Sequence, residues 1–339
     1  MLKKTLNGFV FVLNVGSSFL LLFSCLLPYI SSALVPSMSI LSLFVPFLVV
    51  ANLLFLLFWL LQFKKAVLLP VFSLVVAYFF IGSFFQFRAE RPLPAEKDFT
   101  VMSFNTRLFN KYQWSEDLSI ASQIISFVTH SDPSILCFQE FDVAMTSRFK
   151  AYPYKYISAS DNSKQAVQAI FSKFPIKSKG KLPFLNSTNT AIYVDLEIGS
   201  RPLRLYNIHL QSLRVKPEVS SLEAGKRERL YKRLKVSFAK QQEQAALIAS
   251  HIKESPYKVI VAGDFNTNQF SSVYHTIKKG LEDSFTVAGS GYGKTFDFKY
   301  FPMRIDFLLS DPSYEVIYHK NYPLSLSDHF PLMAAYLLK

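Results

Sequence analysis

The first quarter of the sequence lacks charge. No charged residue lies between Lys4 and Lys64, and the first acidic residue of the chain is Glu90. A soluble domain of that size needs charged side chains on its surface, so residues 1–87 are excluded as an ordinary soluble fold. Apolar runs close to 20 residues long are typical of helices that cross a bilayer. We therefore predict a membrane anchor at residues 1–87.

The anchor divides into three predicted transmembrane helices, at about 8–28, 39–62 and 66–87. Lysines precede the first span and separate the second from the third, whereas the loop at 31–38 has none. The positive-inside rule then predicts a cytoplasmic amino terminus and, after three crossings, an extracytoplasmic domain. As an alternative, the first span is a cleaved signal peptide, with Ser-Ser-Ala at 31–33 as its cleavage site. The domain ends on the same side of the membrane in both cases.

Cysteine is also scarce. The chain has two, Cys25 in the first predicted span and Cys137 in a predicted buried strand. We expect no disulfide between them, and Cys137 is most simply a small core residue. Cysteine usage therefore does not decide the compartment.

Positive charge dominates the rest of the chain. Of the 37 basic residues, four lie in the anchor, which leaves 33 against 24 acidic residues. Such a balance favours anionic partners, namely phosphate esters, nucleic acid or acidic lipid headgroups. The segment 226–235 is especially basic, and it fits docking on an anionic surface or simply a solvated helix face. No protein partner is inferred.

Residues 88–98 are predicted to be a linker, and residues 99–339 a single domain with interleaved strands and helices. Several strands are continuously apolar, as in sheets covered on both faces, which predicts an α/β or α+β layered domain. The predicted strands are 99–104, 135–138, 155–158, 167–172, 191–198, 203–210, 259–262, 305–310, 315–319 and 331–338. The predicted helices are 116–129, 222–253 and 271–279.

Polar residues follow the apolar runs of this domain. In VAGDFN (261–266), Asp264 and Asn266 come directly after a buried strand, although Gly-Asp-x-Asn is also a common Asx turn. A carboxylate beside a carboxamide suits orienting and deprotonating a water molecule. Strand ends meet at one rim of a sheet, so side chains remote in sequence converge there. The other polar residues at predicted strand ends are Asn105, Glu140, His209, Asp306, Asp328 and His329.

Glu140, Asn105 and Asp328 form an all-oxygen group, which suits Mg²⁺ or Mn²⁺ better than zinc. Each of them taken alone could instead have a purely structural role. For example, Glu140 could cap a helix, and Asp328 could cap the turn at Pro331. His329 follows an acid directly, and Asp306 is a second carboxylate that would keep its ring protonated. His209 alternates with the apolar residues Ile208 and Leu210 on a predicted strand, so it could equally be a half-buried histidine without a catalytic role.

The ordered set of motifs resembles the endonuclease/exonuclease/phosphatase superfamily. The matching elements are Asn105, Gln139-Glu140, Ser172 to Ile176, His209, the GDFN of 263–266, Arg304 to Phe307 and Ser327-Asp328-His329. The resemblance covers about 99–339. It implies a four-layered α/β sandwich, two packed mixed sheets flanked by helices, here preceded by the three transmembrane helices. It also implies Mg²⁺-dependent hydrolysis of phosphate esters.

Carried over by position, the resemblance gives Glu140 as the principal metal ligand, with Asn105 and Asp328 near the ion. Asp264 would activate the water and Asn266 would hold a phosphate oxygen. Asp306 would orient His329 against the scissile phosphate, and His209 would be the second phosphate-facing histidine. One departure is Arg107, which stands where abasic-site endonucleases have an acid, and it weakens the case for a DNA-repair enzyme.

Three functions compete. The first is a membrane-anchored phosphoesterase that hydrolyses a phosphodiester by in-line attack of water. Its substrate would be a phospholipid or another membrane-proximal ester. The second is an extracytoplasmic nuclease, whose basic segment would neutralise DNA or RNA phosphates. The third is a non-catalytic anchored binding module, against which the intact set of site residues argues. The sequence leaves open diester against monoester specificity, the metal used and the oligomeric state.

Overall fold

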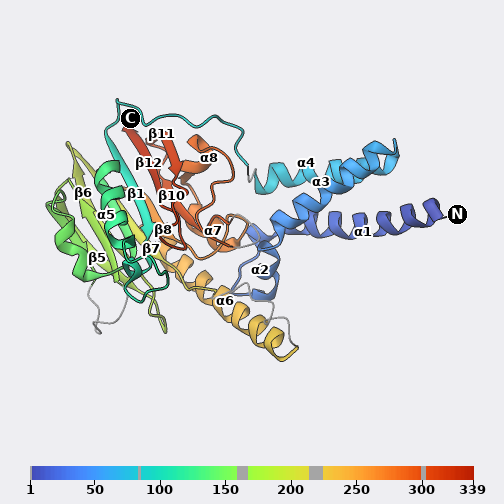
Figure 1. Cartoon of the computed structure of the whole chain (residues 1–339), viewed down its shortest axis with the longest axis horizontal. Helices are drawn as coiled ribbons and strands as arrows, with labels where there is room; N and C mark the ends of the chain where they lie inside the picture. Colours follow the sequence, from blue (N-terminus) through green and yellow to red (C-terminus); the bar gives the residue numbers. More distant parts are fainter. Residues whose placement is uncertain (1, 83–84, 159–166, 214–223, 299–302) are drawn as a thin grey trace. The chain divides into compact units, whose positions relative to one another are not determined.

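The computed structural model describes residues 2–82, 85–158, 167–213, 224–298 and 303–339 (Figure 1). The chain forms two compact units. The first, here called the helical unit, comprises residues 1–84, 221–243 and 267–276. The second, called the sheet unit, comprises residues 85–220, 244–266 and 277–339. Two segments from the second half of the sequence thus belong with the apolar amino-terminal region.

The helical unit contains four helices from the amino-terminal region and parts of two later ones. They are α1 (Leu2–Ser24), α2 (Pro36–Ser42), α3 (Val45–Leu61) and α4 (Leu68–Ile81), with the first part of α6 (Ala224–Lys253) and most of α7 (Ser272–Lys278). Short 3-10 turns at Leu27–Tyr29 and Lys65–Val67 connect them. All four amino-terminal helices are free of acidic residues.

The structure does not contain the three full spans that we predicted. Within the described residues, one helix, Lys3–Tyr29, is long and apolar enough to cross a membrane. The helices α2 and α3 meet that criterion only when counted as one span, and they are bent by 51°. Pro46, in the first turn of α3, explains the break, because proline begins a helix well but cannot continue one. The third predicted span corresponds to α4, which ends at Ile81 instead of residue 87, because Gly82 takes a positive φ of 75°.

A ladder of polar side chains joins α1 to α3. The Ser18 hydroxyl donates to Asn52 Oδ1 at 2.8 Å, and the Asn52 amide donates to Ser17 Oγ at 3.0 Å. One turn further along, the Trp59 indole N–H donates to Asn14 Oδ1 at 3.0 Å. Because Asn14, Ser18 and Asn52 are fully buried, these bonds fix the register of the two helices.

The segment after the GDFN motif also belongs to the helical unit. Phe270 is buried in a cluster with apolar residues from the end of α1, the start of α3 and the end of α4, namely Leu21, Cys25, Val45, Ala77 and Ile81. The Asn268 amide donates to the Ser42 carbonyl at 2.8 Å, and the hydroxyls of Ser32 and Ser272 lie 2.7 Å apart. The amino-terminal helices therefore have a structural partner elsewhere in the chain.

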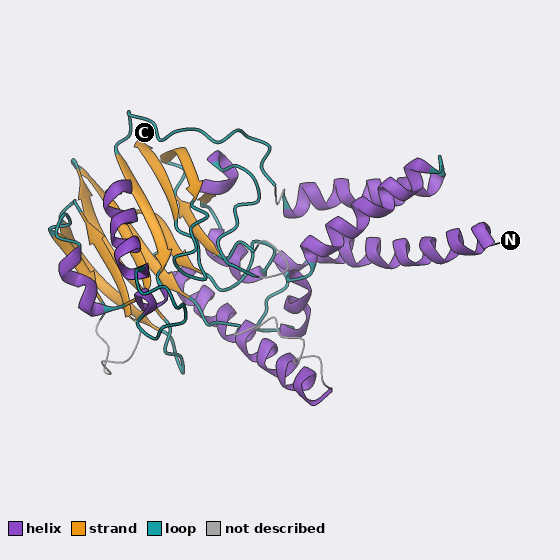
Figure 2. Cartoon of the chain, in the orientation of Figure 1, coloured by secondary structure: helices purple, strands orange, loops and turns teal. Residues whose placement is uncertain are grey.

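The sheet unit is built from two six-stranded mixed sheets (Figure 2). The first has the order β11-β12-β1-β2-β4-β3 and the second β5-β6-β7-β8-β10-β9. The strands are β1 (Phe99–Asn105), β2 (Ile135–Phe141), β3 (Tyr154–Ile157), β4 (Val167–Ser172), β5 (Ile176–Pro183), β6 (Thr190–Ile198), β7 (Arg201–His209), β8 (Lys258–Asp264), β9 (Glu282–Asp283), β10 (Asp306–Ser310), β11 (Tyr314–Asn321) and β12 (Leu332–Leu338). The pairs β1–β2 and β7–β8 are parallel, whereas the other pairs are antiparallel.

Alternate side chains of the central strands serve two cores. On β1, Phe99 and Val101 face the core between the two sheets, while Met102 and Phe104 face the opposite side. There they pack with Ile124 and other apolar residues of α5 (Ile120–Ser131). A strand buried on both faces reads as a continuous apolar run, which is the pattern that VMSF shows. The predicted pair of packed mixed sheets with flanking helices is confirmed. A short helix, α8 (Ser284–Ala288), completes the unit.

Candidate active site

The polar residues singled out in the sequence gather at one rim of the two sheets. Asn105 ends β1, His209 ends β7 and Asp264 ends β8. Asp306 begins β10, where we expected a strand end. Because β10 runs antiparallel to β8, with Asp306 opposite Asp264, the beginning of β10 lies at the same rim as the end of β8.

Unusual backbone conformations place several of these side chains. Glu140 has φ of 47° and lies where the register of β2 and β4 shifts, so a bulge re-aims its carboxylate. Asn266 has φ of 51°, and its backbone N–H donates to Asp264 Oδ1 at 2.8 Å. Gly263 has φ of 138°, and a Cβ there would lie 2.1 Å from the carbonyl oxygen of Ile208. Only glycine allows β7 and β8 to approach so closely beside Asp264.

Asp264 lies at the centre of the site and is almost fully buried. Its Oδ2 accepts from the side-chain amides of Asn105 and Asn266, each at 3.1 Å. The same oxygen is 3.5 Å from Nε2 of His209 and 3.7 Å from Nε2 of His329. Asn105 comes from the first sheet and Asp264 from the second, so the site joins the two sheets.

His329 is held by a second buried carboxylate. Its Nδ1 donates to Asp306 at 2.9 Å from Oδ2 and 3.2 Å from Oδ1. Asp306 is fixed in turn, because its backbone N–H donates to Thr295 Oγ1 at 3.0 Å. The imidazole therefore points its Nε2 toward Asp264, and its tautomer and orientation are set by Asp306.

The charges of the site shift the pKa values of its members. Burial alone would lower the pKa of His329, but Asp306 and Asp264 outweigh it and raise the pKa to about 10. Burial raises the pKa of Asp264 to about 6. The charge of His329 lowers this pKa, and the charge of Asp306 raises it further. Burial lowers the pKa of His209 despite the nearby Asp264. At neutral pH the site thus holds one imidazolium, one neutral imidazole and a carboxylate able to take a proton.

Glu140 and Asp328 complete the acidic side of the site. Burial raises the pKa of Glu140, and His329, the Asn105 amide and Arg107 act in the opposite direction. Asp328 pairs with the Arg107 guanidinium at 3.2 Å. These interactions bring all eight site residues predicted from the sequence into one region.

The residues present fit a divalent cation. Asp264, Asp306 and His329 offer ligand atoms within 4.8 Å of one another. Asp306 holds His329 protonated, so an ion at this group would have to displace the imidazole proton. Glu140, Asn105 and Asp328 supply oxygen donors without such an obstacle, and a hard cation prefers oxygen ligands. Glu140, Asn105 and Asp328 are thus a second candidate group for a divalent cation beside Asp264, Asp306 and His329.

Sequence reasoning missed some residues of the site. Asn207 is fully buried two residues before His209, where it accepts from Gln139 Nε2 at 2.7 Å and donates to the Phe138 carbonyl at 2.9 Å. It ties β7 to the strand that carries Glu140. The signal was present, since Asn207 and His209 alternate on one strand. Thr295 gave no signal, because it lies in a loop with no regular pattern.

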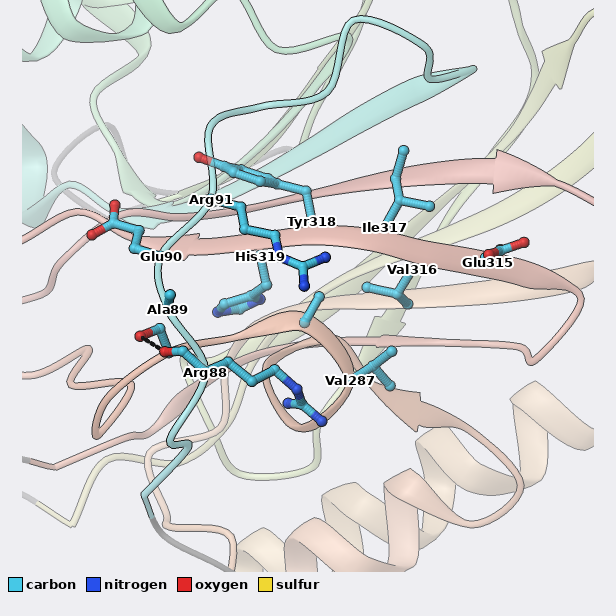
Figure 3. Close-up of a pocket in the computed structure, with 12 residues that line it drawn as sticks. Arg88, Ala89, Glu90, Arg91, Val287, Glu315, Val316, Ile317, Tyr318 and His319 are labelled. Atoms are coloured by element: carbon cyan, nitrogen blue, oxygen red, sulfur yellow. Dashed lines mark hydrogen bonds between the residues drawn. The ribbon is translucent and has the colours of Figure 1, made fainter.

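A cavity of about 370 Å³ lies elsewhere on the sheet unit and contains none of the site residues (Figure 3). The predicted linker forms one side of it and β11 another. Its two arginines, Arg88 and Arg91, are balanced by Glu90 and Glu315. His319 adds no charge, because burial lowers its pKa to about 4. The charges of the lining therefore favour neither a cation nor an anion in this cavity.

Comparison with known proteins agrees with this geometry. The model of the endonuclease/exonuclease/phosphatase family matches residues 102–329, and a domain of unknown function matches residues 7–84. No curated protein matches the sequence significantly.

Solved structures share the fold. A Bacteroides thetaiotaomicron mannosyl-6-phosphatase is 19% identical with a TM-score of 0.54, covering 71% of this chain and 100% of its own. An endonuclease/exonuclease/phosphatase from Bacteroides vulgatus is 20% identical with a TM-score of 0.55, covering 71% and 99%. D. rerio TDP2, complexed with a single-strand DNA product, is 15% identical with a TM-score of 0.54, covering 70% and 98%. The chain belongs to the endonuclease/exonuclease/phosphatase family and is a metal-dependent hydrolase of phosphate ester bonds.

Proposed function

We propose that this protein is a membrane-anchored, Mg²⁺-dependent phosphoesterase that hydrolyses a phosphate ester at the outer face of a membrane. The observation that carries the proposal is the convergence of Asp264, Asp306 and His329 with the amide of Asn105. Two buried carboxylates and an imidazolium at hydrogen-bonding or ion-pair distance suit proton transfer from water and stabilisation of a phosphoryl group.

In the proposed reaction, Asp264 accepts a proton from the attacking water. The amides of Asn105 and Asn266 hold its Oδ2, so the carboxylate is oriented before the substrate arrives. His329, kept cationic by Asp306, stabilises negative charge that develops on the phosphoryl oxygens. A divalent cation bound at Glu140, Asn105 and Asp328 would polarise the phosphoryl oxygen and stabilise the leaving oxygen.

The membrane part of the proposal is supported by the helical unit. The end of α1, the start of α3 and the end of α4 share one buried cluster, so α3 runs opposite to α1 and α4. Lys3 and Lys4 begin α1, and Lys64 and Lys65 separate α3 from α4, so the lysines lie away from that cluster. By the positive-inside rule, the lysine end is cytoplasmic and the chain leaves α4 on the outer side.

The basic segment 226–235 would assist docking on anionic headgroups. It lies in the helical unit, and Arg227, Arg229, Lys232 and Arg233 are exposed there. Each cation near an anionic lipid surface contributes roughly 1 kcal/mol. Reversing the charge of two exposed members, Arg229→Glu and Arg233→Glu, should weaken turnover on anionic vesicles and leave turnover of a soluble ester unchanged.

The same positive charge supports a second candidate, an extracytoplasmic nuclease. Phosphate neutralisation by lysine and arginine makes nucleic-acid binding fall steeply with salt. A nuclease should therefore cleave oligonucleotides with a strong salt dependence and without lipid. A lipid esterase should require vesicles and depend on their anionic lipid content.

The test uses the full chain in detergent or lipid nanodiscs, because removing the amino-terminal helices would expose Phe270. Phospholipid, oligonucleotide and soluble phosphate ester substrates are offered with Mg²⁺ and with EDTA. Asp264→Ala should remove turnover of whichever ester is cut while hydrogen exchange of β1 and β8 stays native. Retained turnover by that folded variant would show that the proposed site is not catalytic.

A further inference from the structure

Arg107 lies beside the acidic side of the site, and no role was predicted for it. Its guanidinium is 3.2 Å from Asp328 Oδ2 and stacks over the Trp114 ring at 4.8 Å. Its charge also reaches Glu140, whose pKa it lowers against the effect of burial. The Arg107 side chain is 41% exposed, so solvent and a substrate can reach it.

The backbone that presents Arg107 is strained and firmly held. Residues 107–110 all have positive φ, between 45° and 62°, although none is glycine. Such residues are unfavourable and persist only where the surroundings hold them. The Arg107 N–H donates to Asn105 Oδ1 at 3.2 Å, and Phe109 is buried among aromatic rings of the core. The position of the guanidinium is therefore built into the fold.

Arg107 completes the charge balance of the site. Glu140, Asp264, Asp306 and Asp328 carry four negative charges when ionised, whereas the His329 imidazolium and a divalent cation together carry three positive ones. Without Arg107 the loaded site has one net negative charge, and with it the site is neutral. An anionic substrate pays a smaller electrostatic penalty in a neutral site, and a dianion gains about twice as much as a monoanion.

We propose that Arg107 is a substrate-binding residue that selects terminal phosphates, the dianionic phosphomonoesters, over internal phosphodiesters. This inference rests on the proposed function and names its substrate class. The guanidinium fork can bind two non-bridging oxygens of either ester at once, so the selection comes from the charge of the phosphate. A phosphomonoester carries close to two charges at pH 8, because its second pKa is about 6, whereas a diester carries one.

The test compares p-nitrophenyl phosphate with bis(p-nitrophenyl) phosphate, which have the same leaving group, using the full chain in detergent at pH 8 with Mg²⁺. Hydrogen bonds to charged groups contribute about 1.5–3 kcal/mol, which corresponds to roughly 10-fold to 100-fold in rate. We expect Arg107→Gln to lower kcat/KM about 100-fold for the monoester and at most about 10-fold for the diester. Arg107→Lys should recover part of the loss, because it keeps the charge without the fork.

Lys111→Gln is the matched control. Lys111 is also 41% exposed and also pairs with a carboxylate, Asp142 at 3.1 Å, but that carboxylate is not part of the site. This variant should leave the monoester to diester ratio unchanged. Binding of orthophosphate and of dimethyl phosphate, measured by calorimetry, gives a readout that does not depend on turnover. Arg107→Gln should weaken orthophosphate binding at least tenfold more than dimethyl phosphate binding.

An equal loss for both substrates would overturn the proposal and show that Arg107 only holds Asp328 in place. Failure of the proposed function looks different, since the unaltered chain would then hydrolyse neither ester. In that case the binding measurement still decides the role of Arg107, because equal weakening of the two ligands contradicts selection by charge.

Discussion

The imidazole Nδ1 of His329 lies 2.9 Å from Oδ2 of Asp306. Both residues are buried, although they are 23 positions apart in the sequence. Replacing Asp306 with Asn should remove the largest of the charges that keep His329 protonated. We expect kcat to fall by about 10² to 10³, the usual loss when one group that stabilises transition-state charge is removed. The measurement is kcat for the best substrate at pH 7.5.

Asp195→Asn is the control for that prediction. Asp195 is buried and pairs with Arg204 at 2.7 Å, but it makes no contact with the site residues. This variant should lose stability and keep kcat. Equal kcat losses for Asp306→Asn and Asp195→Asn would mean that buried charge as such, and not the His329 pair, supports turnover.

Glu140 should dominate metal binding. We expect Glu140→Gln to weaken Mn²⁺ affinity at least about 100-fold in a calorimetric titration, because a neutral amide replaces a charged oxygen ligand. Asp142→Asn is the comparison, since its carboxylate caps a turn two residues away and pairs with Lys111. Unchanged Mn²⁺ affinity in Glu140→Gln would place the ion elsewhere, for example at the Asp264, Asp306 and His329 group.

Gly263 should tolerate no side chain. Alanine there would place its Cβ 2.1 Å from the Ile208 carbonyl oxygen at a φ of 138°. We expect a loss of about 3 kcal/mol or more in the free energy of unfolding, because backbone atoms of both β7 and β8 would have to move. Hydrogen exchange of β8 measures this. Gly199→Ala, also at positive φ but in open space, should cost only about 1 kcal/mol.

The sequence predicted well those elements whose apolar residues follow a regular pattern of burial. β4 was predicted with its observed bounds, and α6 within two residues of its start, because apolar periodicity reports burial directly. β5 was missed because it is an edge strand with mostly exposed residues, such as Lys177, Lys179 and Lys181. The candidate site residues were proposed from their position after buried strands, and the structure brings them into one region. The positions of Arg107 and Thr295 beside this site were not predicted, because they depend on backbone strain and loop geometry that no pattern encodes.

The second and third spans of the anchor were predicted too long for a related reason. Hydropathy reports composition and is blind to where a helix bends or stops. Pro46 and Gly82 set those points, the first by breaking α2 from α3 and the second by ending α4. Hydropathy also gave no hint that Phe270, far along the chain, belongs to the same unit.

His319 should make the sheet unit sensitive to acid. Its folded pKa is lowered to about 4 by burial, while its unfolded value is near 6.5. Above pH 6.5 both states are neutral and no cost arises. Between pH 6.5 and 4 the unfolded state binds the extra proton, so stability falls progressively, by about 3 kcal/mol in all. His319 therefore lowers the unfolding midpoint of the full chain in detergent between pH 7.5 and 5, while Asp264, whose pKa is raised to about 6, acts in the opposite direction, so the test is the difference between the unaltered chain and a His319 variant.

His319→Gln should lower the midpoint at pH 7.5, since contacts of the ring with Ser284 and Asn321 are lost. The drop between pH 7.5 and 5 should nevertheless become smaller. His130→Gln, at an exposed helix position, should change neither value. An acid-induced drop that persists undiminished in His319→Gln would assign the sensitivity to other groups.

The first helix should be retained in the mature protein instead of being removed as a signal peptide. Its Ser18 donates to Asn52 and its Asn14 accepts from Trp59, so loss of α1 would leave Oδ1 of Asn52 and the indole N–H of Trp59, both buried in α3, without these partners. An unsatisfied buried polar group costs about 1–3 kcal/mol, and more in hydrocarbon, where water cannot replace the partner. Mass spectrometry of the protein extracted from membranes should therefore find α1 present. A mature chain beginning near residue 33 would show that α3 and α4 are stable without it.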